Sequence, residues 1–331
     1  MTSASPTRDF DHVILTRFSV RFPESPPIDE DWLAYRWAFF RDALAASAAR
    51  QTERDFQWLV FFDIDTPVWL LEEIEALRPG LFTPVYVSSW SSAIAQRAVA
   101  DVSSAPYLIT TRIDSDDAIA RQFVADVQSH FDHQESLYIN LLCGVQVERT
   151  GEVYRYDEPS NPFISYVEKR VESDAPRTVF QSLSHGRSRW FADLLNIVGP
   201  PRWMQIIHGS NIANGVRGLR DRPESFEADF DFDLPFDRTV SPGRYRRERA
   251  RSLADLLWLW ALHPYYFREF LRARRLRRSG TRLLAQTKEP VTYERQRSKA
   301  PRSIKFVVRA LRRKDGERRS QRNRGPHASV S

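Results

Sequence analysis

The sequence predicts an α/β fold built on a mostly parallel sheet flanked by helices. Short, nearly continuously apolar segments of strand length alternate with helical segments of ten or more residues over about the first 150 residues. Strands that are apolar on both faces are typical of parallel sheets covered by helices. With 331 residues, of which 42% are hydrophobic, the chain can also bury a large core.

The predicted elements follow one another in regular order. Val13 to Val20 is an apolar run that predicts the first strand, and Asp31 to Ala49 is rich in Trp and Phe and predicts the first helix. Further strands are expected at 56–62, 82–87, 107–113 and 137–147, and further helices at 68–77, 91–101 and 118–131. This alternation is what βαβ units produce.

Polar side chains are found toward the carboxyl ends of three of these strands. They are Thr16 and Arg17, then Asp63 and Asp65, then the Asp-x-Asp of Asp114 and Asp116. In open α/β sheets, ligands bind beyond the carboxyl ends of the strands. We therefore expect a binding site at this edge.

The acidic segment after the fourth strand has two interpretations. Asp114 and Asp116 stand at i and i+2, so in an extended chain both carboxylates reach one Mg²⁺ or Mn²⁺ ion. Asp-Ser-Asp-Asp is also typical of a helix N-cap. Asp117 is the better candidate for capping the helix expected at 118–131, which leaves the other two for a metal.

After Gly151 the sequence becomes rich in aromatic and turn-forming residues, and we expect this half to shape a second binding pocket. A short strand is predicted within 201–211, and strand and loop within 179–190. The segment 252–272 predicts a helix rich in Trp and Tyr. It either packs on the domain or lies in a membrane interface.

The charge is distributed unevenly along the chain. Residues 271–331 contain 20 Lys and Arg against 4 Asp and Glu, a net of +16, whereas the remainder has 29 against 39, a net of −10. Nucleic acid or an anionic membrane surface attracts such a tail, although a solvated tail is equally consistent with it. We expect no nucleic-acid partner, because the acidic body offers no companion basic face.

The cellular compartment is predicted from features that the sequence lacks. Cys143 is the single cysteine, so there is no disulfide framework, and a reducing compartment is expected. The first residues lack the blocks of a signal peptide, and no window is long and apolar enough to span a bilayer. The prediction is a cytoplasmic protein, with peripheral contact at the inner membrane face through 253–331 as an open alternative.

Four segments together carry a family resemblance. They are Ile14-Leu15-Thr16-Arg17-Phe18, Trp58 with Asp63 to Pro67, Thr111-Arg112-Ile113-Asp114-Ser115-Asp116-Asp117-Ala118, and Gln205-Ile206-Ile207-His208-Gly209-Ser210-Asn211. In this combination the chain resembles the GT-A glycosyltransferases (nucleotide-diphospho-sugar transferases with a Rossmann-like fold). It looks most like the putative rhamnosyltransferase family. The resemblance covers roughly residues 10 to 265 and excludes the basic tail.

The resemblance implies a nucleotide-sugar donor whose diphosphate is held through Mn²⁺ or Mg²⁺ by Asp114 and Asp116, with His208 as a further metal ligand. It also implies that Asp63 or Asp65 contacts the nucleoside. Thr16 and Arg17 would lie beside the nucleotide, although Arg17 is alternatively an ion-pair partner of Asp63. The acceptor would be a glycan or a lipid-linked molecule, and rhamnose is the sugar that the family label suggests.

An inverting transferase also needs a carboxylate that deprotonates the acceptor hydroxyl. The candidates are Asp157, Glu158, Glu168 and Glu172, among which we favour Glu168 or Asp157. The expected division is a flexible N-terminus (1–10), a donor-binding half (11–150), an acceptor-side half (151–250), an amphipathic helix (251–275) and a basic, largely disordered tail (276–331). A basic-tailed nucleic-acid-binding protein and an inactive transferase-like scaffold are the competing hypotheses.

Overall fold

The computed structural model describes residues 9–22, 29–171, 174–182, 184–208, 215–230 and 240–287. These residues all belong to one compact unit, Met1–Lys288. The predictions for residues 1–8, for most of the basic tail (288–331) and for Glu172 lie outside the described residues.

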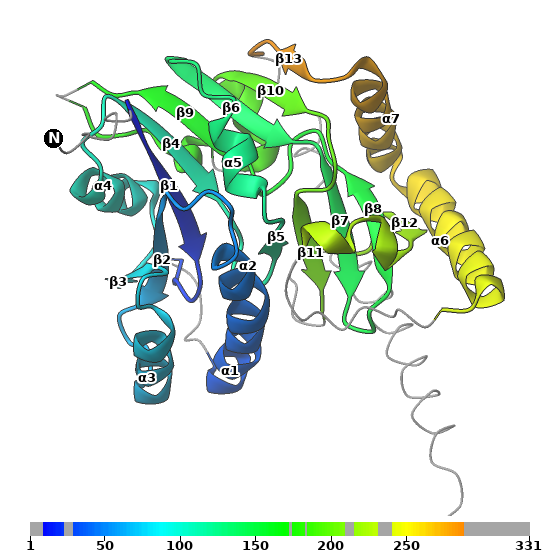
Figure 1. Ribbon diagram of the computed structural model, residues 1–331, viewed down its shortest axis with the longest axis horizontal. Coiled ribbons are helices and arrows are strands. Elements are labelled where there is room, and N and C mark those ends of the chain that lie inside the picture. Colours follow the sequence, from blue (N-terminus) through cyan, green and yellow to red (C-terminus); the bar gives the residue numbers. More distant parts are fainter. Residues whose placement is uncertain are drawn as a thin grey trace, which may run out of the picture. The chain divides into compact units, whose positions relative to one another are not determined.

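An eight-stranded sheet forms the larger layer (Figure 1). Its strands in spatial order are β13 (Arg282–Leu284), β10 (Asp193–Ile197), β6 (Ser136–Leu141), β9 (Ser165–Lys169), β4 (Tyr107–Arg112), β1 (Phe10–Arg17), β2 (Gln57–Asp63) and β3 (Thr83–Val87). The strands β4, β1, β2 and β3 run parallel, as do β6 and β10. β9 lies antiparallel between β4 and β6. The predicted α/β class with a mostly parallel sheet is confirmed.

Helices cover both faces of this sheet. One face packs against α1 (Glu30–Phe39), which continues through the π-helical turn Phe40–Ala45 into α2 (Ala46–Ala48), and against α3 (Val68–Leu77) and α5 (Phe123–Gln128). The other face packs against α4 (Ser92–Val102) and the 3₁₀ turn Val179–Gln181. A hydrophobic core lies on each face of the sheet, and alternate residues of β2 point to opposite faces. Trp58 packs in the core under α1, α3 and α5, and Leu59 packs in the core under α4.

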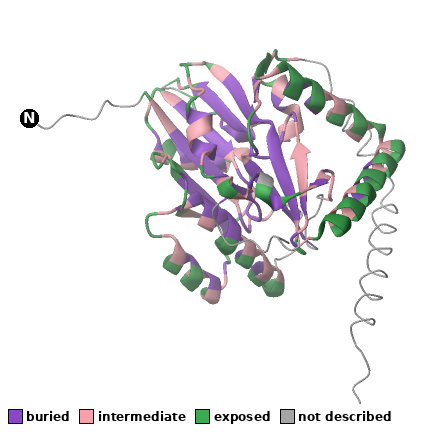
Figure 2. Cartoon of the chain, turned by 45° about the vertical axis from the view of Figure 1, so that its right-hand side comes forward, coloured by how far each residue is buried: buried purple, intermediate pink, exposed green. Residues whose placement is uncertain are grey.

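A second, five-stranded sheet carries the rest of the fold. Its order is β12 (Leu219–Asp221), β8 (Val153–Asp157), β7 (Cys143–Glu148), β11 (Trp203–Ile207) and β5 (Ala118–Ile119). Besides Val179–Gln181, 3₁₀ turns are formed by His185–Trp190, Pro223–Ser225 and Glu227–Asp229. The long helices α6 (Pro242–Leu262) and α7 (Pro264–Ser279) are largely exposed (Figure 2), and Leu276 of α7 packs on Cys143.

Three element predictions were wrong in detail. The helix expected at 118–131 is β5 followed by α5, and Asp117 caps no helix: its carboxylate accepts a hydrogen bond from the Ile206 amide (3.1 Å), which holds this segment against β11. The strand expected at 137–147 is two strands in different sheets. The helix expected at 252–272 is broken at Pro264, which lacks the N–H that a continuous helix needs.

Three further segments are the aromatic, turn-rich stretch 151–170, the stretch 179–190 for which strand and loop were expected, and the described residues 217–230. The first contributes β8 and β9, the second forms two 3₁₀ turns, and the third contains β12. Among the described helices, none is both long and apolar enough to cross a membrane.

Candidate functional site

The end of β4 and the end of β11 bring two predicted residues together. The Nε2 atom of His208 lies 2.9 Å from Oδ2 of Asp116, although the two residues are 92 positions apart in the sequence. The Asp116 residue is 5% exposed and the His208 side chain is fully buried. The pairing of the Asp-x-Asp motif with the late histidine is therefore present in the structure.

Residues of the first helix hold this pair in place. Arg36 donates to both carboxylate oxygens of Asp116 (2.5 and 3.1 Å) and to the hydroxyl of Ser115 (2.8 Å). The His208 ring stacks on Phe39, with the centroids 4.3 Å apart. Arg36 was not among the residues predicted from the sequence. The one signal available was its i, i+4 spacing from Trp32, over whose ring the guanidinium lies at 5.4 Å.

Asp114 points to a different partner. Arg112 donates to both its carboxylate oxygens, at 2.9 to 3.1 Å. Burial alone would raise the pKa of Asp114, but the positive charges of Arg112 and Arg17 outweigh it and the pKa is lowered. Asp114 is therefore held as an anion, two residues from Asp116.

Asp63 and Asp65 form a second charged group beyond β2. Arg21 donates to both carboxylates, and the Asp65 amide donates to Oδ1 of Asp63 at 2.8 Å. Arg21 is the ion-pair partner of Asp63, and among the described residues Arg17 makes no ion pair with Asp63, contrary to the alternative given for it. Burial opposes ionisation of Asp63, but its hydrogen bonds with Arg21 lower the pKa.

Thr16 and Arg17 differ sharply in environment. The Thr16 hydroxyl is buried and accepts a hydrogen bond from Nε1 of Trp58 at 3.0 Å, so it serves the core of the sheet. The Arg17 guanidinium lies 5.3 Å from the Trp90 ring centroid and 5.2 Å from that of Phe180. Burial and the neighbouring charge of Arg112 lower the Arg17 pKa to about 10.

The two carboxylates favoured as general base are both engaged elsewhere. Glu168 accepts hydrogen bonds from the amides of Arg177 and Thr178, each at 2.9 Å. It pairs with Leu108 in the sheet, six residues before Asp114, which at 3.3 Å per residue is on the order of 20 Å away. Asp157 forms an ion pair with Arg277 at 2.9 Å. The structure does not bring Glu168 to the pair of Asp116 and His208.

The side chains at this site meet only part of what a divalent metal ion needs. A carboxylate oxygen and an imidazole nitrogen, as at Asp116 and His208, are both ligands that Mn²⁺ accepts. No group of three His, Cys, Asp or Glu side chains converges as a metal site among the residues described. Asp114 would have to turn from Arg112 to join, and a cation would compete with Arg36 for Asp116.

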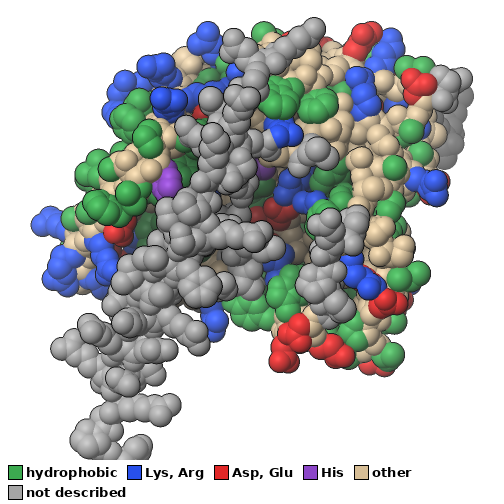
Figure 3. Space-filling view, turned by 180° about the vertical axis from the view of Figure 1, so that it is seen from behind, with side chains coloured by type: hydrophobic (Ala, Val, Ile, Leu, Met, Phe, Trp, Pro, Cys, Tyr) green, Lys and Arg blue, Asp and Glu red, His purple; other side chains and the backbone are tan. Residues whose placement is uncertain are grey.

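Charged side chains of both signs lie side by side in the middle of one molecular face (Figure 3). At the site itself, Arg36 pairs with Asp116 and Arg112 with Asp114, and guanidinium groups of this kind can also bind an anion.

Comparison with known proteins decides the family. A sequence model of the family described as "Putative rhamnosyl transferase" matches residues 27–220, more than half of the chain. The chain belongs to this family. The family resemblance predicted from the sequence is thereby confirmed, and the description of the family makes glycosyl transfer the class of reaction. No curated protein matches the chain.

Several solved structures are similar at low identity. TarS of S. aureus with UDP-GlcNAc is 13% identical over 73% of this chain and 71% of its own, with a TM-score of 0.38. A "putative nucleotide-diphospho-sugar transferase" of Desulfovibrio desulfuricans is 11% identical over 74% and 97%, with a TM-score of 0.31. GalNAc-T7 with UDP, GalNAc and Mn²⁺ is 10% identical over 74% and 48%, with a TM-score of 0.32. With TM-scores this low, the similarities carry no argument about the ligands of this member of the family.

Proposed function

We propose that this family member is a GT-A type glycosyltransferase that moves a sugar from a nucleotide-diphosphate donor to a hydroxyl acceptor. The observation that supports it most is the convergence of Asp116 and His208 at the ends of two strands, with Asp114 beside them. Rhamnose is the donor sugar that the family description favours.

Different residues of the site would bind different parts of the donor. Asp116 and His208, with Asp114 turned toward them, would hold Mn²⁺ or Mg²⁺, which neutralises charge on the leaving diphosphate. Arg17 and Arg112 place positive charge beside Asp114 and would steer the donor phosphates. Beyond β2, Asp63 and Asp65 offer carboxylate oxygens to the hydroxyls of a ribose.

A panel of nucleotides tests this function directly. Thermal unfolding is measured with UDP, dTDP and GDP, each with and without Mn²⁺. One nucleotide should raise Tm by several degrees only when the metal is present, since a ligand at 100 times its Kd adds about 2.7 kcal/mol of stability. Equal shifts without metal would contradict the metal-dependent site. No shift with any nucleotide would contradict donor binding as a whole.

A nucleic-acid-binding protein is the competing function, supported by the net charge of +16 over residues 271–331. Removing residues 289–331 distinguishes the transferase from the nucleic-acid-binding protein, because the truncation leaves the compact unit that ends at Lys288 intact. A transferase should keep its metal-dependent nucleotide binding after this truncation.

We further propose a peripheral membrane contact by α6 and α7. Six large apolar side chains on these helices are exposed: Leu253, Leu257, Trp258, Leu262, Phe267 and Phe270. Trp258 alone is 68% exposed. Arginines share the same helices, and such a combination of Trp, Leu and Arg is typical of helices that lie in a bilayer interface.

Replacing Leu257 and Trp258 together by Ala should weaken sedimentation with anionic phosphatidylserine vesicles by at least about tenfold, because their apolar area no longer enters the interface. Val68→Ala is the matched control, since Val68 is 71% exposed on α3 and lies outside this surface. Equal sedimentation of the double variant and the control would contradict the contact.

A further inference from the structure

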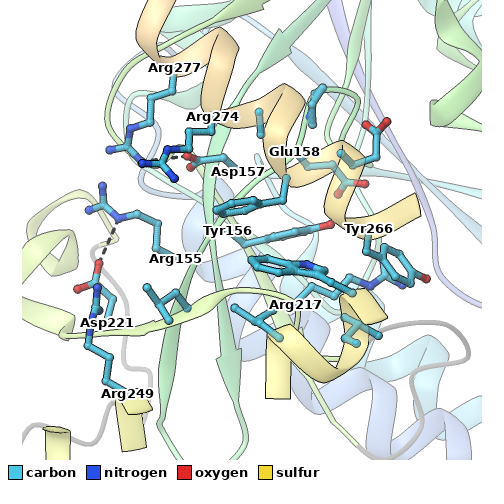
Figure 4. A pocket seen from close by; sticks show the side chains of 18 residues that line it. Arg155, Tyr156, Asp157, Glu158, Arg217, Asp221, Arg249, Tyr266, Arg274 and Arg277 are labelled. Carbon is cyan, nitrogen blue, oxygen red and sulfur yellow. Dashed lines mark hydrogen bonds and ion pairs between the residues drawn. The ribbon is translucent and has the colours of Figure 1, made fainter. Parts of the chain in front are cut away.

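A cavity of about 460 Å³ lies between the second sheet and the two long helices (Figure 4). Strands β8 and β12 form one wall and α6 and α7 the other, and we call it the α6–α7 cavity. Its volume is in the range of small-ligand sites. None of the residues assigned above to the donor and metal lines it, so a ligand bound here is additional to the donor.

The cavity is separate from the site of Asp116 and His208. Glu158 lines the cavity, and its amide donates to the carbonyl of Leu142, just before β7, at 3.0 Å. His208 follows the last residue of β11, which pairs with Glu148 at the end of β7. At about 3.3 Å per residue, the six residues of β7 place these two levels roughly 20 Å apart. Glu158 is therefore too far from the pair to serve as a general base there.

Much of the cavity lining is apolar. Its apolar side chains include Leu219, Leu256, Leu259, Trp260, Phe270 and Ala273. Burial raises the pKa of Glu158 to about 7, against the lowering effect of Arg217, and burial also raises the pKa of Glu269. Carboxyl groups respond in this way where water is scarce. The apolar part of a ligand would therefore lose contact with water on entering this cavity.

Arginine side chains gather at one side of the cavity, away from Glu158 (Figure 4). They are Arg155, Arg249, Arg274 and Arg277. Two of them are neutralised by carboxylates of the lining, Arg155 by Asp221 at 3.1 Å and Arg277 by Asp157 at 2.9 Å.

The other two arginines have no such partner. Among the described residues, neither Arg249 nor Arg274 forms an ion pair, and Arg249 donates to a backbone carbonyl and a tyrosine hydroxyl, which are uncharged. Positive charge is therefore left over at this side of the cavity, and a phosphate group would balance it.

The apolar lining continues onto the exposed surface of α6 and α7. Phe270 lines the cavity and is 40% exposed. The ring centroid of Trp260, also in the lining, lies 4.6 Å from that of Phe270 and 5.3 Å from that of Phe267, which is 41% exposed. Both phenylalanines belong to the surface proposed above to contact a membrane. An apolar chain can therefore extend from the cavity to that surface and keep apolar neighbours along its length.

We propose that the α6–α7 cavity binds one anionic amphiphile, a phosphate group carried on an apolar chain, as in a membrane lipid. The phosphate lies at the side of Arg249 and Arg274, and the chain lies against Trp260 and Phe270. The inference rests on the proposed membrane contact for the source of the ligand, and it assigns the ligand no part in sugar transfer.

Calorimetric titration of the full chain with dodecyl phosphate, below its critical micelle concentration, tests the site. One molecule should bind per chain. Methyl phosphate has the same anionic head without the chain, and dodecyltrimethylammonium has the same chain with a positive head. Each should bind at least about tenfold more weakly. Equal affinity for methyl phosphate would identify a site for free phosphate and overturn the proposal, as would equal affinity for the ammonium compound.

A pair of matched charge variants tests the place of the phosphate. Arg249→Gln combined with Arg274→Gln should raise the Kd of dodecyl phosphate by about tenfold or more, because charge-assisted hydrogen bonds are lost. Arg246→Gln combined with Arg275→Gln removes the same charge from exposed positions of α6 and α7 outside the lining, and its affinity should match that of the wild type.

A pair of matched Trp variants tests the place of the chain. Leu259→Trp should abolish binding, because the larger ring occupies the cavity. Leu253→Trp should not, since Leu253 is 46% exposed on the same helix and outside the lining. Unchanged affinity in Leu259→Trp or in the Arg249 and Arg274 variant would overturn the assignment, as would absence of binding to the wild type.

The variant with both Leu257 and Trp258 replaced by Ala distinguishes the cavity from the membrane contact. Neither residue lines the cavity, so this variant should bind dodecyl phosphate with wild-type affinity even as its sedimentation with vesicles falls. Unchanged sedimentation with normal dodecyl phosphate binding would count against the membrane contact and leave the cavity assignment in place. Loss of dodecyl phosphate binding in this variant would show that the ligand lies on the exposed surface and overturn the cavity assignment.

Discussion

Asp116→Asn should weaken metal-dependent binding of the nucleoside diphosphate by at least about 100-fold. The amide removes the negative charge that a divalent ion needs, and changes even one shell further from a metal typically cost 10- to 100-fold in affinity. The amide keeps an oxygen that can accept from Arg36, so the packing of α1 on this segment is retained. Calorimetric titration of the nucleotide in the presence of Mn²⁺ measures the effect.

Asp42→Asn provides the control for this change. Asp42 is exposed and pairs with its neighbour Arg41, so the same substitution there alters charge without touching the site. Its binding should equal that of the wild type. If Asp116→Asn also kept wild-type affinity for nucleotide and metal together, Asp116 would not be a ligand. A cooperative unfolding transition in both variants ensures that a loss of binding is not a loss of fold.

The strand ends were predictable because their chemistry is local. An apolar run followed at once by carboxylates identifies the end of β4, and the run before His208 identifies the end of β11. The two ends belong to different sheets, so parallel strand order does not explain why they meet. Asp116 reaches His208 because β5, directly after the acidic segment, pairs antiparallel with β11, and the sequence did not predict that pairing.

The arginine partners were not predictable in the same way. Arg36 is one of many arginines in the chain, and its helix buries Trp37 and Leu33 by ordinary packing. Which carboxylate it meets depends on how the helix crosses the sheet, and no spacing in the sequence encodes that crossing. Arg21 is similar, since it follows β1 in a loop and reaches back to Asp63 and Asp65.

Glu168 lies far from Asp116 and His208 for a topological reason. Glu168 was one of the acidic candidates within the aromatic segment that follows Gly151, and that segment turns back and inserts β9 antiparallel to β4. The inserted strand carries Glu168 toward the start of β4, where two amides bind it. Antiparallel insertion into a parallel sheet leaves little trace in hydrophobic pattern, since both kinds of central strand are buried on both faces.

Trp203→Ala should be the most destabilising single change in the second sheet, at about 3–5 kcal/mol, the usual cost of truncating a buried Trp. Trp203 is fully buried, stacks on Phe163 at 5.2 Å, and donates from Nε1 to the carbonyl of Leu141 at 2.7 Å. It begins β11, the strand that ends beside His208. Urea unfolding would measure the loss.

Gly144 makes this prediction sharper, because the indole lies directly against it. A Cβ at Gly144 would fall 2.2 Å from ring atoms of Trp203, so Gly144→Ala should itself cost about 1–3 kcal/mol or more through overpacking. In the Trp203→Ala background the added methyl enters the vacated space, and the two costs should fall well short of additive. Gly199→Ala, with nothing within 4 Å, should be near neutral. Additive losses in the double variant would show that the indole does not occupy this position over β7.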